Sequence, residues 1–183
     1  MRRATPALIL LVTLAACSPA ADTGNDGAAD NGTLAAGPET AISNVAANDL
    51  PEGLAALVEA TVPGMTIVEA ERKEREGRIY YDVEGTKPDG SEVEIDVLAG
   101  AGGKLTAVEV QRDIDWTSAP TQVRAAAAAK KDAFTPHRVI ESRQVEGGEK
   151  IYELFAPGKP GEPAMEVRWQ NGKAEVLGER WAH

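Results

Sequence analysis

The chain has 183 residues, one cysteine, two histidines and a formal net charge of −10. An acidic protein lacks the basic surface that nucleic-acid phosphates require, so nucleic acid is excluded as a partner. A single cysteine excludes a disulfide framework, and two histidines make a hydrolytic triad or a multi-histidine metal site hard to build, so we predict no cofactor and no dedicated metal site.

The N-terminus is typical of a cleaved export signal. Met1-Arg2-Arg3 is followed by a short apolar run, PALILLVTLAA, that ends at Ala16. The run is too short for a permanent membrane helix, which needs about 20 residues. Leu14-Ala15-Ala16-Cys17 resembles the lipobox of bacterial lipoproteins, which implies cleavage before Cys17 and lipidation of its thiol. The alternative is an ordinary secretory signal with a chance cysteine.

Lipidation of Cys17 would anchor the protein to a membrane. Several acyl chains on one residue anchor a protein stably. Ser18 follows the cysteine, where an aspartate would resemble the inner-membrane retention signal of enteric bacteria, so we predict an outer-membrane anchor facing the periplasm. Residues 17–47 are rich in Ala, Gly, Asn, Asp and Thr and contain no aromatic residue, which predicts a disordered linker after the signal peptide of residues 1–16.

The remaining sequence alternates between helical and strand patterns. Leu50-Pro51-Glu52 is typical of a helix start, and the helix is expected to end at Pro63-Gly64. A second helix is expected from Ala119-Pro120 to about Phe134. Period-two alternation and turn residues predict strands at 65–75, 78–84, 92–98, 104–110, 138–145, 150–155, 164–169 and 173–178.

This order of elements recurs about 70 residues later, as in an internal duplication. Ile67-Val68-Glu69 aligns with Val139-Ile140-Glu141, and Tyr81-Asp82-Val83 aligns with Tyr152-Glu153-Leu154. We therefore predict an α+β protein of two tandem repeats, residues 48–115 and 116–183. Each repeat is expected to pack one helix on a three- to four-stranded antiparallel sheet.

The first repeat resembles a known family. Tyr81-Asp82-Val83-Glu84, the Asp89-Gly90 turn, the strand from Val93 to Val97 and Gly103-Lys104-Leu105 together resemble the PepSY domain. Tandem copies are similar in architecture to β-lactamase inhibitory protein. The resemblance implies peptidase inhibition or protein binding, and it supplies no catalytic residues.

Strand parity separates two faces of the predicted sheets. One face should pack on the helices through Tyr81, Val83, Val93, Ile95, Val97, Tyr152, Leu154, Met165, Val167 and Trp169. The opposite face is expected to be open and acidic in its first half, with Ile151 exposed on it. We predict a partner-binding surface there, formed by Tyr80, Asp82, Glu84, Glu92, Glu94, Asp96 and Phe155.

Like charges on neighbouring strands repel, so a basic partner would relieve this surface. We therefore predict a non-catalytic binding or peptidase-inhibitor-like module with a protein partner in the cell envelope, either basic or a peptidase. The alternatives are a plain solvated sheet face, binding of cations or a cationic envelope ligand by the acids, and an enzyme that uses two of the many carboxylates.

Overall fold

The computed structural model describes residues 41–75 and 77–181, so the predicted signal peptide, Cys17 and most of the predicted linker lie outside the described residues. No helix within these described ranges is long and apolar enough to cross a membrane. Among the described residues, the α-helices are α1 (Leu54–Thr61) and α2 (Thr121–Ala128). The strands are β1 (Ala41–Asn44), β2 (Thr66–Arg75), β3 (Arg78–Thr86), β4 (Glu92–Ala99), β5 (Leu105–Asp113), β6 (Arg138–Gln144), β7 (Lys150–Phe155), β8 (Met165–Gln170) and β9 (Lys173–Val176). Short 3₁₀ helices lie at Ala47–Asp49, Ala101–Gly103 and Trp116–Ser118.

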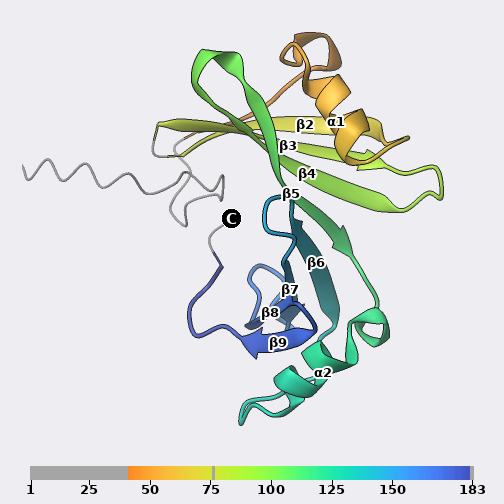
Figure 1. Cartoon of the computed structure of the whole chain (residues 1–183), viewed down its shortest axis with the longest axis vertical. Coiled ribbons are helices and arrows are strands. Elements are labelled where there is room, and N and C mark those ends of the chain that lie inside the picture. Colours follow the sequence, from red (N-terminus) through yellow and green to blue (C-terminus); the bar gives the residue numbers. More distant parts are fainter. Residues whose placement is uncertain (1–40, 76, 182–183) are drawn as a thin grey trace, which may run out of the picture.

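The strands form one antiparallel sheet of nine, in which sequence order is also spatial order from β1 to β9 (Figure 1). The prediction of two repeats, each with a helix on its own small sheet, is therefore wrong. Strand β1 also occupies residues that the sequence had placed in the linker, and it pairs with β2.

The continuity of the sheet comes from the pairing of β5 with β6, in which Glu109 faces Gln144 and Asp113 faces Ile140. Strand β5 extends beyond the predicted strand of residues 104–110 and ends at Asp113. Its extra residues supply the backbone groups that β6 needs. An unpaired strand edge is unfavourable, so pairing across the middle of the chain satisfies both edges at once.

Both helices pack on the same face of the sheet, here called the helix side. Leu54 and Val58 of α1 join Val83, Ile95 and Val97 in one buried cluster. Val123 and Ala127 of α2 lie in a second buried cluster, with Val139, Tyr152, Leu154, Met165 and Val167. The helix-facing parity predicted for β3, β4, β7 and β8 is confirmed, with Tyr81 and Trp169 only partly buried.

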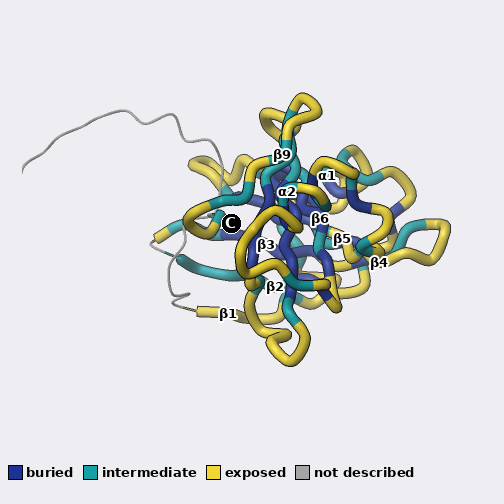
Figure 2. The backbone as a smooth tube through the Cα atoms, turned by 90° about the horizontal axis from the view of Figure 1, so that it is seen from below, coloured by how far each residue is buried: buried dark blue, intermediate teal, exposed yellow. Residues whose placement is uncertain are grey.

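The opposite, helix-free face is far less open than predicted. Tyr80, Ile151 and Phe155 are 1%, 0% and 4% exposed, so the expectation that they project into solvent is wrong. Tyr80 packs with Leu98 and Val108 in a third apolar cluster. Parity assigns a side chain to a face but does not say whether the sheet is flat. Figure 1 shows the sheet bending near β5, and Figure 2 shows the buried positions gathered in the interior of the molecule.

Candidate functional site

A pocket of about 260 Å³ opens on the helix-free side, across the strands where the two halves of the sheet meet. Strands β3 and β4 supply one wall, β5 and β6 the other, and the start of β2 closes one end. Its lining residues are Val68, Glu84, Gly85, Thr86, Glu92, Val93, Glu94, Gln111, Arg112, Asp113, Arg138 and Ile140. We call it the acidic pocket.

A bulge in β2 shapes one end of the acidic pocket. The register between β2 and β3 shifts between Ile67 and Glu69, which leaves Val68 outside the ladder and 70% exposed. The two strands approach closely here, because a Cβ placed on Gly85 would lie 2.4 Å from the carbonyl oxygen of Thr66. Glycine is therefore required at this position, and the bulge turns an apolar side chain toward the pocket mouth.

The basic groups of the pocket are engaged by other acids. Arg138 Nε and Asp113 Oδ1 are 2.8 Å apart, and Arg112 makes an ion pair of 2.8 Å with Glu141. No ion pair within the described residues joins Glu84, Glu92 or Glu94 to a basic group. Glu84 and Glu92, together with Glu94 when it is ionised, therefore give the pocket its negative potential.

A buried group of acids, which we call the carboxylate cluster, lies beside the pocket on the same face. It consists of Asp82, Glu94, Asp96 and Glu109. Asp82 faces Asp96 across β3 and β4, and Asp96 faces Glu109 across β4 and β5. Glu94 lies in the next row and also lines the pocket. Asp82, Asp96 and Glu109 are 7%, 2% and 2% exposed, so these carboxylates have little access to water.

Polar neighbours compensate the cluster in part. Lys73 of β2 makes an ion pair with Asp82. The amide of Gln111 donates to Asp96 Oδ2 at 3.3 Å, and the amide of Gln144 donates to Glu109 Oε1 at 3.0 Å. The carboxylates still lie close to one another, and this proximity affects the pKa of two of them.

Two members of the cluster hold protons more tightly than usual. Burial, followed by the charge of Asp82, raises the pKa of Glu94 from 4.5 to about 7. Burial, again followed by Asp82, also raises the pKa of Asp96 well above its ordinary value. Both shifts follow from the cost of placing like charges together in a poorly solvated site.

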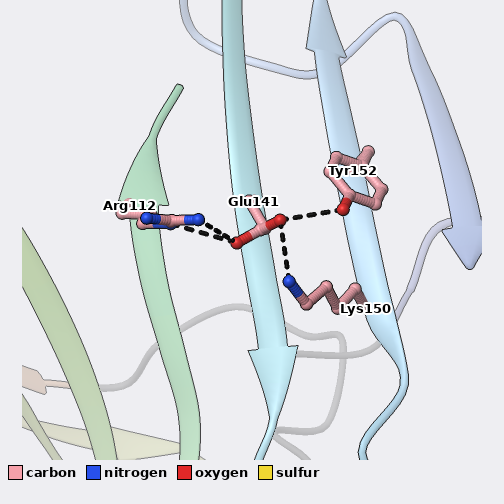
Figure 3. A network of polar contacts seen from close by, with 4 residues as sticks. All are labelled: Arg112, Glu141, Lys150 and Tyr152. Atoms are coloured by element: carbon pink, nitrogen blue, oxygen red, sulfur yellow. Dashed lines mark hydrogen bonds and ion pairs between the residues drawn. The ribbon is translucent and has the colours of Figure 1, made fainter. Parts of the chain in front are cut away.

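A second polar network surrounds Glu141 (Figure 3), and its Tyr152 belongs to the buried cluster that α2 forms on the helix side of the sheet. Glu141 of β6 accepts hydrogen bonds from Arg112 Nη2 at 2.8 Å, Lys150 Nζ at 3.0 Å and the hydroxyl of Tyr152 at 2.8 Å. Burial alone would raise the pKa of Glu141, but these three donors outweigh it and hold the pKa below its ordinary value. Burial and Glu141 together raise the pKa of Tyr152, so its hydroxyl stays a donor. This network joins β5, β6 and β7, where the two halves of the sheet meet.

The structure divides the predicted binding residues into three groups. Glu84, Glu92 and Glu94 line the acidic pocket, whereas Asp82 and Asp96 lie in the carboxylate cluster next to it. Tyr80 and Phe155 are not exposed anchors of either. Tyr80 belongs to the third apolar cluster, and the guanidinium of Arg138 lies 5.3 Å from the centre of the Phe155 ring.

Several residues of the site escaped the sequence analysis. Glu109 and Gln111 were missed because a bulge between β4 and β5 shifts the register after Asp96 and alters the parity of β5. Lys73 was missed because it lies among other charged residues of β2. Asp113 is close to a basic residue only because β5 pairs with β6. The two residues are 25 positions apart in the sequence, so no pattern within one strand indicates their contact.

Comparison with known proteins adds no relative, because no family model, curated protein or solved structure matches the chain. The resemblance to the PepSY domain therefore stays a prediction. So do the cell-envelope location and the absence of catalytic activity.

Proposed function

We propose that the chain is a lipid-anchored, non-catalytic binding module of the cell envelope, and that its acidic pocket receives a basic side chain of a protein partner. The observation that carries the proposal is the pocket lining, in which Glu84, Glu92 and Glu94 form no ion pair with a basic group among the described residues. Val68 and Ile140 provide apolar surface beside these acids. Lysine and arginine combine an apolar stem with a charged end, so such a side chain matches both parts of the lining.

The resemblance to PepSY domains supports a protein rather than a small cation as the ligand. That family implies protein binding in the manner of a peptidase inhibitor. A pocket with acids at its wall would attract a basic partner over a distance and orient it before contact.

Changing two pocket acids tests the proposal. In the full chain with Cys17→Ser, Glu84→Gln together with Glu92→Gln should remove two charges without disturbing the fold, since both side chains are exposed. We expect the association rate with the envelope partner to fall about tenfold at low salt, and the difference to shrink at high salt. The partner is captured from envelope extract, and binding is followed by surface plasmon resonance.

The matched control is Glu146→Gln together with Glu179→Gln, which removes the same charge from exposed positions outside the pocket. A partner that the control retains and the pocket variant loses supports the proposal. Equal association rates for the two double variants would refute it.

Anchoring is a separate prediction. Cys17→Ser removes the only thiol of the chain, so lipidation cannot occur and the protein should move from the membrane fraction to the soluble fraction. Cell fractionation followed by immunoblotting measures this. A variant that still sediments with membranes as the wild type does would show that Cys17 is not the anchor.

An enzyme is the second candidate, because Glu94 lines the pocket and its pKa of about 7 would suit a general acid. The geometry argues against it. Carboxylate oxygens of Asp82, Glu94 and Asp96 lie within 4.8 Å of one another. The two carboxyl groups of a glycosidase stand about 5 Å or more apart, so the cluster does not have the spacing of a glycosidase pair. A binding module remains the better account.

A further inference from the structure

Three carboxylates converge inside the carboxylate cluster. One oxygen from each of Asp82, Glu94 and Asp96 lies within 4.8 Å of the other two. Asp82 and Asp96 face each other across β3 and β4, and Glu94 projects from the same face of β4, two residues earlier. The sheet backbone holds all three side chains, so their convergence is fixed by strand register.

The environment of Asp96 is the independent observation that points to a ligand. Its side chain is 2% exposed, and Gln111 donates a hydrogen bond to only one of its two oxygens, Oδ2. Oδ1 is buried and accepts no hydrogen bond from the described residues. Leaving a buried carboxylate oxygen without a donor is costly, and a bound cation would remove that cost.

Charge in the cluster points the same way. The three converging carboxylates of Asp82, Glu94 and Asp96 can carry up to three negative charges, and Lys73 brings one positive charge beside Asp82. Like charges in a poorly solvated site repel strongly. A divalent cation between the three converging carboxylates would leave the site close to neutral.

We propose that Asp82, Glu94 and Asp96 bind one Ca²⁺ ion. All three ligands are carboxylate oxygens, which hard cations prefer, and no histidine or cysteine takes part. Ca²⁺ accepts irregular arrangements of oxygen ligands, whereas Mg²⁺ requires a near-ideal octahedron and gives up its waters reluctantly. Three carboxylate oxygens that all lie within 4.8 Å of one another can therefore share one Ca²⁺ ion. This inference goes beyond the proposed function, because it does not depend on a basic partner.

Thermal unfolding of the full chain with Cys17→Ser, after treatment with a chelator, tests the site. We expect millimolar CaCl₂ to raise Tm by about 5 °C, and MgCl₂ to have a smaller effect. NaCl at equal ionic strength controls for screening of the net negative charge. Isothermal titration with CaCl₂ should give one site per chain.

Two ligand variants show whether these residues are responsible. Asp96→Asn and Glu94→Gln keep side-chain size and should each abolish most of the calcium-dependent rise in Tm. Glu94 is only partly buried, so Glu94→Gln should fold even if Asp96→Asn does not. The double variant Glu146→Gln with Glu179→Gln is the control: it removes two exposed charges that belong to neither the pocket nor the cluster, and should keep the response to calcium.

The outcomes are distinct. A response to CaCl₂ that both ligand variants lose and the control keeps supports the site. No response, an equal response to NaCl, or a response that Glu94→Gln retains overturns it. The calcium site is tested by the thermal response of Glu94→Gln, and the proposed function by the association rate of Glu84→Gln with Glu92→Gln, so the two failures are seen separately.

Discussion

Glu141→Gln is expected to lower the free energy of unfolding by about 2–3 kcal/mol. The glutamine keeps the size of the side chain but has one oxygen and no charge. It cannot accept from Arg112, Lys150 and Tyr152 together, as Glu141 does in Figure 3. The buried hydroxyl of Tyr152 loses its charged acceptor. Urea unfolding followed by circular dichroism measures the change.

An exposed ion pair provides the comparison. Arg138 and Asp113 join β6 and β5 with side chains that are 45% and 60% exposed. Asp113→Asn should therefore cost less than about 1 kcal/mol, since solvent screens such pairs. If Glu141→Gln were no more destabilising than Asp113→Asn, the network would not be what stabilises the join between the two halves of the sheet.

The sequence predicted local structure well, because local structure depends on patterns that the sequence displays. The alternation of Tyr81, Val83, Ile95 and Val97 with acids identified two strands and their helix-facing side, and Pro63-Gly64 marked the end of α1. These features are decided by side-chain periodicity and by backbone restrictions on proline and glycine. They do not require knowledge of distant contacts.

The arrangement of the strands could not be read in the same way. Strand β5 precedes α2 in the sequence and β6 follows it, so their pairing joins distant segments. No periodicity within either strand indicates which strand it pairs with. The duplication pattern pointed instead to two separate sheets. The sequence predicted strands within each half of the sheet but not the pairing of β5 with β6 that joins the halves. The acidic pocket lies at this junction.

Burial on the helix-free face was also beyond the sequence. Parity correctly placed Tyr80 and the acids Asp82 and Asp96 on one face, but a flat sheet and a bent sheet have the same parity. The bend buries what a flat sheet would expose. Asp82 and Asp96, which were predicted to lie on the surface, are therefore buried, and the pKa of Asp96 is raised.

That protonation leads to the second large effect: stability should fall as pH rises. Between about pH 5 and pH 8, the free energy of unfolding of the chelator-treated chain is expected to drop by roughly 3 kcal/mol. The pKa of Glu94 is raised from 4.5 to about 7 in the folded chain, and that of Asp96 is raised as well. The folded state therefore binds more protons than the unfolded state in this range. The stabilisation is complete below the unfolded pKa and is lost as pH passes the folded one.

Urea unfolding at several pH values, with wild type and Glu94→Gln side by side, separates this effect from general charge repulsion. Glutamine cannot ionise, so Glu94→Gln should match the wild type near pH 5 and exceed its stability near pH 8. Glu146→Gln, which removes one exposed charge, should keep the wild-type slope because that residue is exposed in a turn. A wild-type stability that stays flat from about pH 5 to pH 8 would mean that the carboxylate cluster is as well solvated in the folded chain as in the unfolded one.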